Sequence, residues 1–177
     1  LTVVAGQIDL VIMKAQLTDT ALESLQIARG ELDRAVRIMK NMRGFSRQRT
    51  PTREPVELNS LLDHVVQLVA YEARRRKVKI VRHHEILPPI IGNSDELAQL
   101  LLNLVNNALE AVSEGGEIRV ETRVLGENGN PVVEVRIIDN GVGISDLELP
   151  RIFDSFFTTK TEGTGLGLWI CQGIAES

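Results

Sequence analysis

Apolar residues recur at alternating steps of three and four along the first 42 residues. This spacing predicts two helices that share one apolar seam and are joined by a polar turn near Thr18 and Asp19. A single hairpin has few residues to cover such a seam, so we expect a second copy of the chain to complete a four-helix bundle. Packing of the seam on the chain's own second domain is the alternative. The seam positions are Val4, Ile8, Val11, Ala15, Leu25, Ala28, Leu32, Ala35, Met39 and Met42.

A polar stretch separates this region from a second set of elements. The helical pattern ends near Gly44, and residues 47–55 are basic and contain two prolines, as is typical of a linker. The strongest later helix is expected over residues 95–113, with Ser94 or Asp95 as its N-cap. The other predicted elements are helices over 58–74 and from about Gly165, and strands over 78–81, 118–124 and 132–138.

This order of elements predicts an α+β protein. We expect an antiparallel helical hairpin over residues 1–50, a linker over 51–57, and a second domain over 58–177. The second domain is expected to be an α/β sandwich with a mixed sheet and helices on one face. Leu1 begins inside a helical pattern and Ser177 follows one without a stop signal, so we expect a fragment of a longer protein.

Composition narrows the expected location and partners. The net charge of −4 gives no basic field, which argues against a nucleic-acid partner. The single cysteine, Cys171, cannot form an intrachain disulfide and suits a reducing, cytoplasmic environment. No apolar run is long enough to span a membrane, so we expect no direct membrane contact in this fragment, with any anchor lying upstream.

The predicted helix over 95–113 carries polar residues beside its apolar stripe. Asn103, Asn107 and Glu110 follow one another at steps of four and three. Asparagine oxygens are good ligands for Mg²⁺, which takes few protein atoms alongside phosphates. The alternative is that these amides bond to nearby backbone. The expected buried stripe is Leu97, Leu101, Leu104, Ala108 and Ala111.

A glycine-containing turn follows the predicted strand over 132–138. The motif Asp139-Asn140-Gly141-Val142-Gly143-Ile144 places a carboxylate at the strand end, where it could accept a hydrogen bond from the exocyclic amine of adenine. The glycines would let the backbone approach a ring closely. An ordinary turn is the alternative, because Asp, Asn and Gly favour turns.

Two further motifs precede the last helix. Glycines alternate through residues 163–168 (Gly-Thr-Gly-Leu-Gly-Leu), and a helix that opens on glycines offers free N–H groups to phosphate. The Lys-Ser/Thr pair of a Walker A loop is absent. A flexible lid hinge is the competing interpretation of these glycines, and both can be true. Three of the four phenylalanines gather in residues 152–160, where they could anchor a loop to the core or begin a lid.

Together these four motifs resemble the asparagine box, the first glycine box, the phenylalanine box and the second glycine box of the histidine-kinase catalytic domain, within the wider gyrase/Hsp90/MutL ATPase fold. The resemblance implies an ATP site in which Asn107 holds Mg²⁺, Asn103 lies near the phosphates, and Asp139 binds adenine N6. It assigns catalytic roles to Asn103 and Asn107. The residues implied to contact ATP are Asn103, Asn107, Asp139, Gly141, Gly143, Ile144, Phe157, Thr158, Thr159, Lys160, Gly163, Thr164, Gly165, Leu166, Gly167 and Leu168.

The amino terminus fits the same family. Residues 1–4 (Leu-Thr-Val-Val) resemble the stretch just after the phosphoacceptor histidine, which places that histidine before Leu1. His64, His83 and His84 lie in the wrong context, and the adjacent pair makes a poor metal site without further ligands. The resemblance implies a homodimer that passes the phosphoryl group to an aspartate on a response-regulator receiver domain.

The residue at position 103 bears on the choice between a kinase and an ATPase. ATP-hydrolysing members of the wider fold carry a glutamate one turn before the metal-binding asparagine, whereas Asn103 is an amide and cannot act as a general base. Transfer of the γ-phosphoryl group of ATP to a positioned imidazole therefore fits this sequence better than hydrolysis of ATP by water. A non-catalytic nucleotide-sensing scaffold and a stand-alone ATPase of the same fold are the alternatives.

Overall fold

The computed structural model describes residues 2–14, 18–30, 32, 53–126, 131–160 and 163–177. These residues form two compact units. The first comprises the described residues up to 32 together with 155–160 and 163–166, and the second comprises all other described residues from 53 onward. The seam positions Ala15, Ala35, Met39 and Met42, and linker residues 47–52, lie outside the described residues.

Helices form the amino-terminal part of the first unit. Helix α1 (Thr2–Lys14) is followed by helical residues 19–30. Thr18 precedes the second stretch as an N-cap, because its hydroxyl oxygen accepts a hydrogen bond from the backbone N–H of Ala21 at 3.3 Å. The Arg29 guanidinium donates to Asp9 Oδ1 at 2.9 Å, so the two helical stretches contact each other.

Helix α1 leaves apolar surface exposed in the single chain. Val4, Leu10, Val11 and Met13 are all exposed, whereas Ala5 is buried. Val4 and Val11 belong to the predicted seam and lie on one side of the helix, whereas Leu10 and Met13 lie on other sides. The expected four-helix bundle stays a prediction, in which a second copy would cover the two exposed seam positions.

A mixed sheet is the frame of the second unit. Strand β2 (Lys79–His84) runs parallel to β4 (Glu117–Leu125), and β4 pairs antiparallel with β5 (Val132–Asp139), giving the order β2-β4-β5. Val120 lies opposite Arg82 on one side and Ile137 on the other. The predicted mixed sheet is therefore confirmed.

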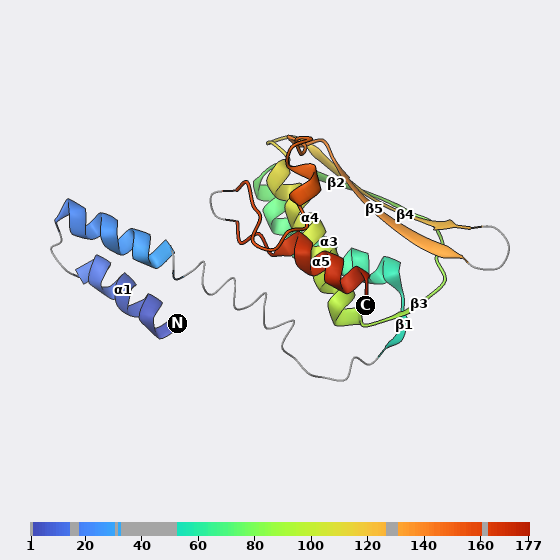
Figure 1. Ribbon diagram of the computed structural model, residues 1–177, viewed down its shortest axis with the longest axis horizontal. Helices are drawn as coiled ribbons and strands as arrows, with labels where there is room; N and C mark the ends of the chain where they lie inside the picture. Colours follow the sequence, from blue (N-terminus) through green and yellow to red (C-terminus); the bar gives the residue numbers. More distant parts are fainter. Residues whose placement is uncertain (1, 15–17, 31, 33–52, 127–130, 161–162) are drawn as a thin grey trace. The chain divides into compact units, whose positions relative to one another are not determined.

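Helices cover one face of this sheet (Figure 1). Helices α3 (Leu58–Arg75) and α4 (Ser94–Ala111) pack on the sheet, and α5 (Gly167–Ala175) packs on α4. The most deeply buried large side chains of the core are Leu62, Val65, Val105, Ile118 and Val120. The opposite face is charged, with Arg123 paired to Glu134 at 2.5 Å. The α+β class, with helices on one face, is as predicted.

Several local features differ from the sequence-based expectation. Residues Glu54–Val56, within the predicted linker over 51–57, form strand β1, which pairs antiparallel with β3 (Ile90–Gly92). The last helix begins at Gly167 instead of near Gly165. The side chain of Asn93, instead of Ser94 or Asp95, caps α4 by accepting the N–H groups of Asp95 and Glu96 at 3.0 and 3.2 Å.

The buried stripe of α4 is also displaced from the predicted one. Leu101 and Ala108 are buried as expected, but Leu97, Leu104 and Ala111 are only half-buried, and Val105 and Leu109 are buried instead. The reason is that α4 packs against both α3 and α5, so its buried surface is wider than a single stripe. A short 3₁₀ helix, η1 (Leu149–Arg151), follows β5 and its turn. Among the described helices, none is long and apolar enough to cross a membrane.

Two leucines of α3 give a matched test of this core. Leu62 is 0% exposed and Leu68 is 59% exposed on the same helix. Leu62→Ala leaves a cavity, and we expect it to lower the free energy of unfolding by about 2–5 kcal/mol. Leu68→Ala should change it by no more than about 0.5 kcal/mol. Urea unfolding followed by circular dichroism measures both, and equal effects would contradict this packing.

Candidate functional site

The two amides of α4 lie at the start of α5. Asn103 and Asn107 are half-buried and one helical turn apart. The side-chain NH₂ of Asn103 donates to the carbonyl of Gly167, the first residue of α5, at 3.4 Å. A methyl group placed on Gly167 would lie 4.0 Å from Asn107 Nδ2. The structure therefore brings three predicted site residues together at the amino terminus of α5.

Cys171 lies one turn further along α5 and supports this packing. Its thiol donates to the carbonyl of Leu100 at 3.6 Å. Burial raises the pKa of the Cys171 thiol, and a side-chain hydrogen bond with Asn103 lowers this pKa by a smaller amount. A thiol with a raised pKa stays protonated and is a poor nucleophile, so Cys171 is a packing residue here.

The loop after β5 is fixed at its first residues. Asp139 ends β5 and is exposed, and its Oδ1 accepts the backbone N–H of Gly141 at 2.9 Å. The N–H of Val142 donates to the carbonyl of Ala111, the last residue of α4, at 3.1 Å. Of the described residues, no protein donor binds the other carboxylate oxygen of Asp139. The contact of Asp139 with adenine stays a prediction.

Gly141 and Gly143 of this loop are needed for two different reasons, close packing and backbone conformation. A Cβ on Gly141 would lie 2.5 Å from the carbonyl oxygen of Ala111, which is closer than real Cβ contacts come. Gly143 has open space around it but a φ of +72°, which L side chains rarely adopt. Ile144 follows and is exposed. Gly141 thus lets the loop touch α4, whereas Gly143 lets the backbone turn.

The loop ends on a polar turn that the sequence analysis missed. Glu148 accepts the hydroxyl of Ser145 at 2.7 Å and the backbone N–H of Ser145 at 3.2 Å. The Ser145 hydroxyl, and after it the backbone N–H, lower the pKa of Glu148. The spacing Ser-x-x-Glu is half of a capping box, and it was the signal available in the sequence.

Residues 155–160 and 163–166, which include the predicted lid residues and belong to the first unit, are joined by a backbone hydrogen bond. The N–H of Phe156 donates to the carbonyl of Gly165 at 2.9 Å. Both residues have positive φ, +66° and +67°, and a Cβ on Gly165 would overlap the backbone of Phe156. Gly165 is therefore required sterically as well as conformationally.

In the same segment, two threonine hydroxyl oxygens accept hydrogen bonds from backbone N–H groups two residues further along the chain. Thr158 Oγ1 accepts the N–H of Lys160 at 3.1 Å, and Thr164 Oγ1 accepts the N–H of Leu166 at 3.4 Å. The remaining lid residues of the prediction lie as follows: Thr159 is exposed, Phe157 and Gly163 are half-buried, and Leu168 is half-buried in the first turn of α5. Residues 161 and 162 lie outside the described part of the chain.

The phenylalanines do not all anchor the loop, which was one of the two interpretations of their clustering. Phe153 and Phe156 are 46% and 65% exposed, whereas Phe157 is half-buried. Aromatic side chains that are largely exposed contribute little burial free energy. The segment therefore depends more on its backbone bonds than on the first two rings.

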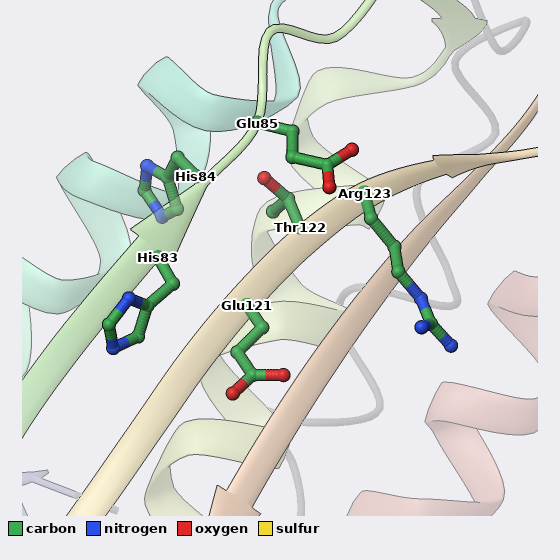
Figure 2. A pocket seen from close by; sticks show the side chains of 6 residues that line it. All are labelled: His83, His84, Glu85, Glu121, Thr122 and Arg123. Carbon is green, nitrogen blue, oxygen red and sulfur yellow. The ribbon is translucent and has the colours of Figure 1, made fainter.

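Two surface hollows lie apart from these motifs. One, of about 390 Å³, is lined by Arg75, Arg76, Val112 and Glu114. The other, of about 290 Å³, lies at the ends of β2 and β4 and is lined by His83, His84, Glu85, Glu121, Thr122 and Arg123 (Figure 2). Within the described ranges, no three His, Cys, Asp or Glu side chains could hold a metal ion together.

Comparison with known proteins agrees with this arrangement. The family described as histidine kinase-, DNA gyrase B- and HSP90-like ATPase matches residues 92–177. The solved catalytic domain of histidine kinase ThkA is 33% identical, with a TM-score of 0.62 over 70% of this chain and 80% of that domain. This chain belongs to the histidine kinase family. Its resemblance to the ATP-binding catalytic domain of that family, seen in the four motifs, is confirmed.

Sensor kinases are among the relatives of this histidine kinase chain. It is 38% identical over 178 residues to the sensory histidine kinase/phosphatase NtrB of Rhizobium meliloti (strain 1021), covering 90% of this chain. It is 36% identical over 155 residues to the sensor histidine kinase ZraS of Salmonella typhimurium (strain LT2), covering 87% of this chain. The chain spans 46% and 33%, respectively, of these two relatives.

The two loop glycines give a matched prediction. Gly141→Ala should lower the free energy of unfolding by about 1–3 kcal/mol, because its Cβ would press on the Ala111 carbonyl. Gly143→Asn should change it by less than about 1 kcal/mol, because asparagine tolerates positive φ and space is open there. Urea unfolding followed by the fluorescence of Trp169 measures both. The account of Gly141 is wrong if its alanine variant is as stable as the parent.

Proposed function

We propose that this chain is the Mg·ATP-binding catalytic part of a sensor histidine kinase and transfers the γ-phosphoryl group to a histidine of the helical hairpin. The observation that carries the proposal is the attachment of the Asp139 loop to α4. The hydrogen bond from Val142 N–H to the Ala111 carbonyl, 3.1 Å long, connects the loop after Asp139 to the helix that carries Asn107. The carboxylate of Asp139 is suited to bind adenine. Adenine and phosphate contacts would thus share one rigid element.

Asp139 supplies the adenine contact in this proposal. One carboxylate oxygen is used by Gly141 N–H at 2.9 Å, which fixes the rotamer of the side chain. The other oxygen accepts the N6 amine, and a charged acceptor makes this hydrogen bond stronger than a neutral one would. The missing Cβ of Gly141 keeps the loop close to α4, and Gly143 and Ile144 line the base.

Asn107 fits a Mg²⁺ ion held between protein and phosphates. Its amide is half-buried beside the start of α5, where Gly167 carries no side chain to fill the space. An amide oxygen is a hard ligand, and Mg²⁺ commonly takes one or two protein atoms together with phosphate oxygens and waters. The bound ion would neutralise charge on the β- and γ-phosphates.

Donors for the phosphates come from the second glycine motif. Helix α5 begins at Gly167, and its first N–H groups have no partner within the helix. In the proposal, the lid and its phosphate contacts come from Thr159, Lys160 and residues 163–167, as the family resemblance implies. Glycines at 163 and 165 let the lid backbone fold at its base.

The amide at position 103 favours transfer to histidine over hydrolysis. Its NH₂ group is directed to the Gly167 carbonyl, and an amide cannot take a proton from water. Glu110 is exposed on the other side of Asn107 along α4. In the step we propose, an imidazole nitrogen forms a bond to the γ-phosphorus while the bond to the β–γ bridging oxygen breaks, and ADP leaves with that electron pair.

The acceptor histidine is proposed to precede Leu1. The three histidines of the chain, His64, His83 and His84, lie on α3 and β2 of the second unit. The exposed apolar surface of α1 supports a homodimer through the hairpin.

A response-regulator receiver domain is the proposed phosphoryl acceptor. A solved structure of ThkA in complex with the response regulator TrrA is similar to 98% of this chain, at 26% identity and a TM-score of 0.69. An aspartate of such a partner would receive the phosphoryl group.

Titration with Mg·ATP tests the adenine assignment. Asp139→Asn should weaken binding by more than about tenfold, because it removes a charged hydrogen-bond acceptor. Asp146→Asn, a change of the same chemistry at an exposed position in the same loop, should leave the dissociation constant within about twofold. Calorimetry measures both. Equal affinity of the Asp139→Asn variant and the parent would rule out the proposed adenine contact.

A further inference from the structure

Strand β5 ends with an unusual pairing. The register of β4 and β5 places Ile118 opposite Asp139, so the next pair is Glu117 and Asn140. Asn140 N–H donates to the Glu117 carbonyl at 3.3 Å, as an antiparallel ladder requires. The return bond comes from the side chain instead: Glu117 N–H donates to Asn140 Oδ1 at 2.9 Å.

This side-chain bond frees the backbone carbonyl of Asn140 from the ladder, while its N–H stays bonded to Glu117. In a regular ladder the backbone carbonyl of Asn140 would accept the Glu117 N–H and hold the chain in the strand direction. Because the side-chain oxygen takes that role, the backbone can turn at once, as side-chain amides do when they replace ladder bonds. The turn lets Gly141 N–H reach Asp139 Oδ1 at 2.9 Å.

The neighbouring glycine makes room for this side chain. A Cβ on Gly116 would lie 2.7 Å from Asn140 Oδ1 and would overlap Val112 Cγ1. The N–H of Gly116 donates to the Ser113 carbonyl at 3.0 Å, which fixes the turn between α4 and β4. The end of β5 is thus held by the connection that leaves α4.

We infer that Asn140 is a positioning residue for nucleotide recognition: its side-chain bond to Glu117 sets the orientation in which Asp139 meets the purine base. The inference rests on the proposed function of Asp139. Asn140 itself does not contact the nucleotide in this account. Its effect passes through the turn that orders the Asp139 carboxylate.

Selectivity between ATP and inosine triphosphate is the readout that separates positioning from a general structural role. Inosine triphosphate carries a keto oxygen in place of the N6 amine. Two hydrogen-bond acceptors, this oxygen and the Asp139 carboxylate, would then face each other. We expect the parent chain to bind Mg·ATP more tightly than the Mg complex of inosine triphosphate. Asn140→Ala should lower this ratio of affinities by roughly fivefold, the equivalent of about one net hydrogen bond.

Two variants serve as controls. Asn140→Asp keeps an oxygen that can accept the Glu117 N–H and should restore most of the ratio. Glu114→Gln lies in the same turn and breaks only the exposed ion pair to Lys77, so it should leave the ratio unchanged. Asn140→Ala in the Asp139→Asn background should have no further effect on selectivity, because both act through one contact.

The outcomes divide cleanly. If Asn140→Ala weakens both nucleotides equally, or leaves both unchanged while Asp139→Asn abolishes selectivity, the positioning role is wrong and the proposed function stands. If the parent binds neither nucleotide, or if Asp139→Asn keeps full selectivity, it is the proposed adenine contact that fails. Calorimetric titration of the intact chain with each nucleotide in Mg²⁺ distinguishes these cases.

Discussion

The second unit depends on the contact between the end of α4 and the loop after β5. Val142 N–H bonds to the Ala111 carbonyl at 3.1 Å, and this approach is possible because Gly141 has no Cβ. Helix α4 also carries the half-buried amides, and it packs on both α3 and α5. One helix therefore sets the spacing between the Asp139 loop and Asn107, which are the residues proposed to bind adenine and Mg²⁺.

This arrangement separates the rigid part of the site from the exposed part. The core side chains of Val105 on α4 and Ile118 on β4 are fully buried, whereas Asp139 and Ile144 are exposed. Polar groups that must bind a ligand can stay open to solvent only if other contacts hold their backbone. Here side-chain hydrogen bonds hold the backbone: two are local, the Asn93 cap and the Ser145–Glu148 turn, and one is non-local, the Asn140 bond to Glu117.

Much of this could be predicted from the sequence because its signals are local. Helical periodicity located α3 and α4, alternation located β4 and β5, and the order of four motifs identified the family. The misses depend on non-local structure. Strands β1 and β3 span three residues each and leave no alternation to detect. Val105 and Leu109 are buried because α4 packs against two helices, and the role of Asn140 depends on a register with Glu117. Three adjacent polar residues at 93–95 could each have capped α4, so composition alone did not select Asn93.

The central claim is that this fold delivers the γ-phosphoryl group to histidine and not to water. The direct measurement uses a chain extended upstream of Leu1 to include the proposed acceptor, incubated with γ-labelled ATP and Mg²⁺. The account predicts a labelled protein that loses its label in acid and keeps it in base, as a phosphohistidine does. Release of labelled phosphate with no labelled protein, despite Mg·ATP binding, would contradict it and identify a stand-alone ATPase.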